Sequence, residues 1–189
     1  ISVCLNSPVH TFDFSYLDGE KRRAPPAMPK LVKEFLTAVQ FAQKQFPHAA
    51  QRGVILAGKS MGSRAAMYLA ESDEADALTV QACLCLGYPI GSDKGSDSAN
   101  SKERFALAQR ASLPVMFVHG TRDRIASIAR IRSVVDARNH HNASSTVLRV
   151  VESGDHSLTV TKSWLSAHRT TQASVDEGVM TEVVSFVNK

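Results

Sequence analysis

The sequence contains few of the features that mark disulfide-stabilised, membrane-spanning or extended proteins. Its 189 residues include only three cysteines, an odd number without the regular spacing of a secreted disulfide framework. No apolar run approaches the roughly 18 residues of a membrane-spanning helix. The composition, 43% hydrophobic and 21% charged, is ordinary for a soluble globular protein and argues against collagen, coiled coil and extensive disorder. This length predicts one domain, residues 1–189, with a sizeable core.

The sequence has only a small excess of positive charge. The net charge is +4, and its most visible concentration is Lys21-Arg22-Arg23. A nucleic-acid-binding surface would need a basic stripe interleaved with aromatic residues, or a known recognition motif, and the sequence has neither. We therefore expect no nucleic-acid partner and no membrane partner. The basic run is interpreted as a solvated turn, with attraction of an acidic substrate as the weaker alternative.

The cysteines and the N-terminus both bear on the cellular compartment. Cys83 and Cys85 lie two residues apart in an apolar run, where a strand would direct both to one face, so we expect buried, reduced thiols. The chain begins at Ile1 without methionine and shows no signal-peptide pattern. We expect a cytoplasmic protein whose sequence is truncated at its N-terminus.

Short apolar runs alternate along the chain with longer segments of helical periodicity. Strands are predicted at Val54–Ala57, Val80–Leu86, Val115–Val118 and Thr146–Val151, and helices at 30–46, 65–70, 102–111, 125–138 and about 175–187. Val9–Tyr16 alternates apolar and polar residues and predicts a further strand. Strands that alternate with helices indicate the α/β class, with a mostly parallel sheet flanked by helices. Such sheets bind ligands at the carboxyl ends of their strands.

The run Gly58–Gly62 (GKSMG) directly follows one predicted strand and precedes a helix. It matches the G-x-S-x-G pattern, in which the serine occupies a sharp, strained turn that lifts its hydroxyl clear of the sheet. We expect Gly58 and Gly62 to be required because a Cβ atom at either position would collide with the turn. Ser60 is therefore the candidate nucleophile, and the backbone N–H of Met61 is the candidate oxyanion donor. An ordinary turn is the alternative.

A histidine and an acid follow two other predicted strands. His156, after the fourth strand, is the candidate general base, and Asp123, shortly after the third, is the candidate acid that orients it. His119 is the rival histidine. Asp155 is the rival acid, although sequence neighbours point apart in most loops, and a surface ion pair with Arg122 or Arg124 is the other interpretation of Asp123. The chain order Ser60, Asp123, His156 is that of α/β-hydrolases.

Five runs together resemble the testis-expressed-protein/NSL-complex-subunit branch of the α/β-hydrolase-like proteins, especially its plant and bacterial members. They are FDFSY at 12–16 with KRRAPP at 21–26, LAGKSMGSR at 56–64, CLGYP at 85–89 and GDHS at 154–157. The resemblance spans about Val9 to the C-terminus, and GKSMGSR is its most specific part. It implies a dienelactone-hydrolase-like core without a metal or organic cofactor. It also implies that Ser60 is the nucleophile, Asp123 the acid and His156 the base.

The N-terminal region departs from this family pattern. Family members carry, upstream of the strand expected at Val9–Tyr16, another strand ending in a His-Gly-x-Gly-type loop that should donate a second oxyanion N–H. Nothing in Ile1–Pro8 matches it, and loss of one such donor can cost about 10²–10³ in rate. Two functions therefore stay open. One is a carboxylesterase-like serine hydrolase of small acyl esters or thioesters; the other is a weakly active or inactive hydrolase-like module that binds a protein partner.

Overall fold

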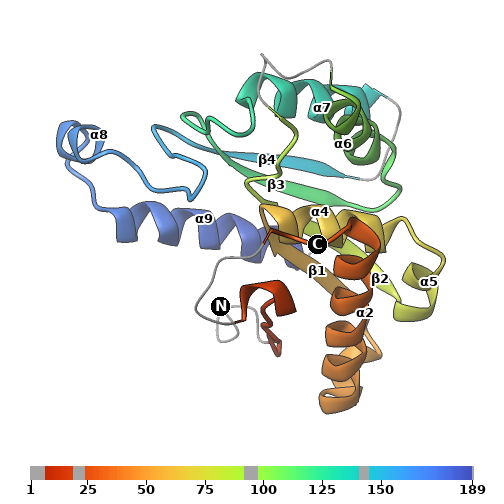
Figure 1. The fold of residues 1–189 in the computed structure, drawn as a ribbon. Coiled ribbons are helices and arrows are strands. Elements are labelled where there is room, and N and C mark those ends of the chain that lie inside the picture. Colours follow the sequence, from red (N-terminus) through yellow and green to blue (C-terminus); the bar gives the residue numbers. More distant parts are fainter. Residues whose placement is uncertain (1–6, 19–23, 92–97, 141–144, 189) are drawn as a thin grey trace.

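The computed structural model describes residues 7–18, 24–91, 98–140 and 145–188. In these residues four parallel strands form one sheet in the order β1 (Val54–Lys59), β2 (Val80–Leu86), β3 (Val115–Gly120) and β4 (Thr146–Val151) (Figure 1). The helices are α2 (Met28–Gln45), α3 (Pro47–Ala50), α4 (Met61–Ala70), α5 (Glu74–Leu78), α6 (Ala99–Arg110), α7 (Ile128–His140), α8 (Lys162–Ala167) and α9 (Gln172–Val187). The predicted α/β class is confirmed.

The two faces of the sheet are covered by different helices. Side chains of α2, α4, α6 and α7 pack with one face, which includes Cys83 and Cys85 of β2. Helix α9 packs on the other face, mainly on β3 and β4, where Leu84 of β2 also points. Both cysteines are buried and free, as predicted. Burial raises the pKa of Cys83 to about 12 and also raises that of Cys85, so neither thiol ionises readily.

The segment Val9–Tyr16 is not the strand that its alternation predicts. It is irregular and ends in one turn of 3₁₀-helix, Ser15–Leu17. Aromatic packing holds it against α2 instead of a backbone ladder: the rings of Phe12 and Phe35 lie 5.1 Å apart. Ser15 also donates two hydrogen bonds to the Glu34 carboxylate, from its N–H at 2.9 Å and its Oγ at 2.7 Å. The alternation therefore reflects one apolar side packed on a helix, and no strand of the described residues pairs with it.

The strands predicted at 80–86 and 146–151 are observed with the same bounds, as β2 and β4. The other predicted elements, except Val9–Tyr16, are present with shifted ends. The strand predicted at 54–57 continues to Lys59, and α4 begins at once with Met61. Three short helices were not predicted, α3, α5 and α8, because segments of four to six residues show too little periodicity. In α9 the spacing predicts that Val179, Val183, Val184 and Val187 face inward. Val179 and Val183 are buried, Val184 and Val187 are only partly buried, and Phe186 is buried as well. The basic run at 21–23 lies outside the described residues.

No helix in the described parts of the chain combines the length and the hydrophobicity needed to cross a bilayer.

One buried arginine of α7 makes hydrogen bonds to α6, to the segment before β3 and to the first residue of β4. Arg138 of α7 is fully buried. Its guanidinium donates hydrogen bonds to the carbonyl oxygens of Ala108, Ala111 and Leu113, and to the hydroxyl of Thr146 at 2.9 Å. Two of these carbonyls close the C-terminal end of α6, where helices leave carbonyl groups without intrahelical partners and favour positive charge. The arginine therefore caps α6 and fixes the starts of β3 and β4.

Arg138→Met is expected to lower the free energy of unfolding by about 3 kcal/mol or more, because several buried carbonyl groups lose their donor. Arg132→Met, on the exposed side of the same helix, is the matched control and should change stability by less than about 0.5 kcal/mol. Urea denaturation followed by circular dichroism measures both. Equal stability of the two variants would contradict the capping role.

Candidate active site

Ser60 occupies a strained turn between β1 and α4. Its φ of 52° and ψ of −115° lie outside the regions that a residue with a side chain normally adopts, which costs about 1–3 kcal/mol. The Ser60 N–H donates to the carbonyl of Leu86 on β2 at 2.9 Å. The Ser60 carbonyl accepts from the N–H of Arg64 and from both the N–H and the Oγ of Ser63. These contacts hold the serine in its turn, as the sequence motif predicts.

The two motif glycines differ in what they contribute. A Cβ atom on Gly58 would lie 2.2 Å from the carbonyl carbon of Gly62 and 2.4 Å from the N of Ser63, so the turn closes only without a side chain there. A Cβ atom on Gly62 would meet nothing closer than the Phe14 ring at 3.9 Å, an ordinary contact. The prediction is therefore confirmed for Gly58 and wrong for Gly62. Gly62 already lies in the first turn of α4, where its Cβ position is directed away from the turn.

Gly58→Ala and Gly62→Ala form a matched pair that tests this difference. Gly58→Ala is expected to destabilise the protein by about 1–3 kcal/mol because backbone atoms must move to admit the methyl group. Gly62→Ala should be neutral or stabilise by up to about 1 kcal/mol, since alanine favours helix. Denaturant unfolding of both variants measures the effect. A loss of the same size in both would show that the two glycines are equivalent.

Ser60, His156 and Asp123 form a continuous hydrogen-bonded chain at the carboxyl ends of the strands. His156 Nε2 lies 2.8 Å from Ser60 Oγ, and His156 Nδ1 lies 2.7 Å from Asp123 Oδ2. An ionised carboxylate can only accept, so the neutral imidazole carries its proton on Nδ1 and donates it to Asp123. The other nitrogen, Nε2, then accepts the hydroxyl hydrogen of Ser60. The structure brings all three predicted side chains together.

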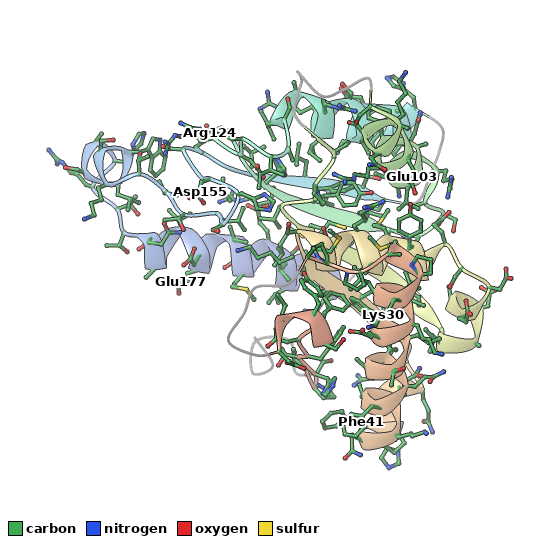
Figure 2. All side chains as sticks on the ribbon, viewed as in Figure 1. Lys30, Phe41, Glu103, Arg124, Asp155 and Glu177 are labelled. Carbon is green, nitrogen blue, oxygen red and sulfur yellow. The ribbon has the colours of Figure 1, made fainter. Side chains whose placement is uncertain are left out.

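The two alternatives for the acid are not supported by the contacts. Asp155 Oδ1 accepts the N–H groups of Ser157 and Thr159, so this carboxylate shapes the loop that presents His156. Figure 2 shows Asp155 in that loop and Arg124 at the surface. The Asp123 side chain is fully buried, whereas Arg122 and Arg124 are exposed. No ion pair joins Asp123 to either arginine among the described residues.

Gly87, directly after β2, leaves the space that His156 occupies. Its φ of 60° is in the left-handed region. A Cβ atom there would lie 3.1 Å from the His156 carbonyl oxygen and 3.4 Å from two atoms of the imidazole ring. The backbone at the end of β2 therefore supports one side of the imidazole. The sequence did not predict this contact.

His119, the rival histidine, lies behind Asp123 and does not reach Ser60. It is fully buried, and its Nε2–H donates to the Ala126 carbonyl at 2.9 Å while lying 3.6 Å from Asp123 Oδ2. Its Nδ1 is buried without a hydrogen-bond partner in the described part of the chain. Burial lowers the pKa of His119, and the opposing effects of Ala126 and Asp123 are smaller. His119 is therefore a neutral side chain that supports the loop of the acid.

The lowered pKa of His119 predicts a defined loss of stability in acid. Below about pH 6.5 the unfolded chain protonates this histidine and the folded chain does not, so stability falls with pH until the lower, folded pKa is reached. His119→Gln removes that contribution. The stability difference, wild type minus variant, should therefore decrease below pH 6.5 by up to about 1.4 kcal/mol per pH unit. Denaturation between pH 7.5 and 5 measures it, and parallel curves would contradict the assignment.

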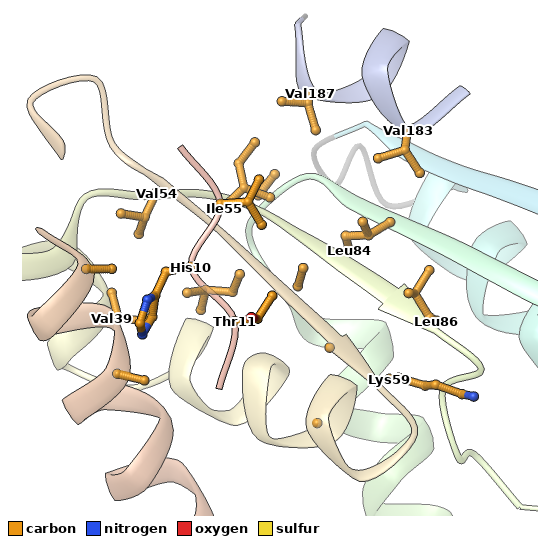
Figure 3. A pocket seen from close by; sticks show the side chains of 18 of the residues that line it. His10, Thr11, Val39, Val54, Ile55, Lys59, Leu84, Leu86, Val183 and Val187 are labelled. Carbon is orange, nitrogen blue, oxygen red and sulfur yellow. The ribbon is translucent and has the colours of Figure 1, made fainter. Parts of the chain in front are cut away.

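A cavity of about 1430 Å³ opens beside the turn (Figure 3). Ser60, Met61 and Gly62 line it, together with the segment 7–17, α2, β1, β2 and α9, whereas His156 and Asp123 do not. Met61 is the first residue of α4, so its N–H belongs to the first turn, where amides lack intrahelical acceptors and negative charge is favoured. Its role as oxyanion donor stays a prediction. Most of Ile1–Pro8, the segment that lacks the family's second-donor motif, lies outside the described residues.

Among the described residues, no three histidine, cysteine, aspartate or glutamate side chains are grouped so as to hold a metal ion.

A model of the alpha/beta hydrolase domain family matches residues 4–188, nearly the whole chain. The chain belongs to this α/β hydrolase family. The match covers the strand ends that carry Ser60, Asp123 and His156, and it agrees with the predicted superfamily. The narrower assignment to the testis-expressed-protein/NSL-complex-subunit branch stays a prediction.

Solved structures show the same fold at low identity. A protein of unknown function from Agrobacterium tumefaciens is 13% identical, with a TM-score of 0.61 over 91% of this chain and 65% of that one. A Pyrococcus furiosus esterase is 14% identical, with a TM-score of 0.57 over 84% and 61%. A monoacylglycerol lipase from Paleococcus ferrophilus is 11% identical, with a TM-score of 0.56 over 87% and 78%. The α/β hydrolase chain therefore spans less than two thirds of the first two structures.

Proposed function

We propose that this α/β hydrolase is a serine hydrolase that cleaves small acyl esters or thioesters through Ser60, His156 and Asp123. The observation that carries the proposal is the pair of hydrogen bonds at 2.8 and 2.7 Å that link Ser60 through His156 to Asp123. A serine hydroxyl is a weak nucleophile unless an adjacent base accepts its proton. Here the base is in contact with the hydroxyl, and a buried carboxylate orients the base.

In the first half of the proposed reaction, Ser60 Oγ attacks the carbonyl carbon of the substrate while its proton passes to His156 Nε2. Asp123 keeps the imidazole oriented and stabilises the imidazolium that forms. The tetrahedral oxyanion accepts a hydrogen bond from the Met61 N–H at the start of α4. Collapse of this intermediate breaks the bond to the alcohol or thiol, and the leaving group takes the proton from His156 Nε2.

In the second half, water attacks the acyl-Ser60 ester. His156 Nε2 accepts a proton from the water, and a second tetrahedral oxyanion forms beside Met61. When it collapses, Ser60 Oγ leaves, takes the proton back from His156, and the carboxylic acid is released. The chain needs no other proton carrier for this cycle.

The substrate class is supported by the character of the site and by two of the structural neighbours. Phe14, Tyr16 and Met61 line the same cavity as Ser60, which suits the apolar part of an acyl group. Two of the structures with this fold are an esterase and a monoacylglycerol lipase. A carboxylesterase-like activity is therefore the form of the proposal that we would test first.

A fluorophosphonate probe tests whether Ser60 is activated. The probe is expected to modify Ser60 in the folded wild-type chain, because it reacts with serines whose proton is accepted by a base. His156→Ala should abolish modification, and Asp123→Asn should slow it by up to about 10⁴-fold through the wrong imidazole tautomer. Mass spectrometry of proteolytic peptides identifies the labelled residue.

His119→Gln is the control for that experiment, since this histidine contacts Asp123 but not Ser60 and should retain labelling. A folded wild-type chain that stays unlabelled would contradict the proposal. That result would favour the hydrolase-like module that binds a protein partner.

A further inference from the structure

Two arginines on neighbouring helices have only one carboxylate close to them. Arg64 lies on α4 and Arg104 on α6, and these helices are in contact. Glu103 of α6, labelled in Figure 2, approaches Arg64 with 3.4 Å between its Oε2 and Nη2. This contact is longer than the roughly 2.7–2.9 Å of a close charge-assisted hydrogen bond, and the Glu103 side chain is 49% exposed. In the described helices the arginine pair therefore keeps an excess of positive charge.

Three buried polar atoms of this cluster have no hydrogen-bond partner among the described residues. They are Nε of Arg64, Nε of Arg104 and the hydroxyl of Tyr68, whose ring centre lies 5.6 Å from the Arg64 guanidinium carbon. The described parts of the chain contain only two other such side-chain atoms, on His119 and Arg149. Buried polar groups nearly always have a partner, so three exceptions in one cluster indicate an acceptor that binds there.

The surroundings of Arg104 favour an acceptor with negative charge. Burial lowers the pKa of Arg104, the charge of Arg64 lowers it further, and the opposing effect of Glu103 is the smallest. Tyr88 stays neutral, because burial raises the pKa of its hydroxyl. The Arg104 guanidinium is held in place by a hydrogen bond of 3.0 Å to the Pro89 carbonyl. An anion between the two guanidiniums would therefore be stabilised by both.

The cluster lies within two helices that the structure describes along their whole length. Arg104 lies six residues after Ser98, the N-cap of α6. Arg64 lies four residues after Ser60, the N-cap of α4, which is about one helical turn. The unpartnered donors therefore belong to continuous secondary structure, close along α4 to the candidate nucleophile.

We propose that Arg64 and Arg104 bind a phosphate group, with the Tyr68 hydroxyl as a further donor. A guanidinium carries five N–H donors in a planar fork that matches phosphate oxygens. A phosphate monoester at pH 7 has a charge near −2, which balances two arginines once the half-exposed Glu103 carboxylate turns to solvent. A carboxylate has one charge and two oxygens in a plane, so it serves three donor side chains less well. This inference goes beyond the proposed hydrolase activity and does not require it.

Nuclear magnetic resonance of the arginine side chains tests the site directly. The Nε–H signals of Arg64 and Arg104, each assigned by its loss in the corresponding Arg→Gln variant, are followed while inorganic phosphate or methyl phosphate is added at pH 7 and constant ionic strength. Both signals should move and saturate together, because both groups gain an acceptor. Acetate should bind at least about tenfold more weakly. Tighter binding of methyl phosphate identifies a phosphate monoester as the ligand, and tighter binding of inorganic phosphate identifies the free ion.

Two substitutions in the cluster should change the affinity for phosphate in opposite directions. Arg104→Gln should weaken binding at least about tenfold, since a charge-assisted hydrogen bond is lost. Glu103→Gln should strengthen it about two- to fivefold, because the competing carboxylate is removed. Arg132→Gln on α7 and Glu177→Gln on α9 make the same charge changes at exposed positions elsewhere, and they should leave the affinity unchanged. If Arg104→Gln fails to fold, the wild-type titration and the exposed Glu103→Gln decide.

Three outcomes would overturn the inference. One is the absence of a saturable shift of either Nε–H signal in the folded wild-type chain. Another is an equal effect of Arg104→Gln and Arg132→Gln, which would mean diffuse attraction to a basic protein. The third is acetate binding as tight as that of both phosphates, which would assign the cluster to a carboxylate. None of these measurements uses a reaction at Ser60, so the proposed function stands or fails separately through fluorophosphonate labelling.

Discussion

The arrangement of the site depends on the hydrogen bonds that the buried carboxylate of Asp123 accepts. One of its oxygens, Oδ1, accepts the N–H groups of Ile125 and Ala126 at 2.8 and 3.0 Å and so folds its own loop. The other, Oδ2, accepts from His156, which belongs to the loop after a different strand. A carboxylate taken out of water must have its acceptor capacity filled. The same need therefore shapes the loop after β3 and fixes the position of the imidazole.

The strain at Ser60 is tolerated because neighbouring elements determine it from several sides. The Leu86 carbonyl on β2 accepts its N–H, and the first turn of α4 donates to its carbonyl. On the other side of the site, the backbone of Gly87 lies against His156. Leu86 and Gly87 are consecutive, so the end of β2 positions the serine and the histidine together. The parallel topology brings the strand ends to one edge of the sheet. In addition, the end of the central strand β2 supports both the serine and the histidine.

The sequence indicated the fold class and the three candidate side chains because those signals are local. A serine between a short apolar run and a helix, and polar residues just after other runs, are visible without knowing which segments touch. The nonlocal features were missed or misjudged. Val9–Tyr16 alternates like a strand, but its aromatic side chains pack on α2. Gly62 fits the motif, yet only Gly58 faces backbone that excludes a Cβ atom. In the sequence Arg138 resembles any helical arginine. Only the structure shows that its guanidinium donates to three carbonyl groups distant in the chain.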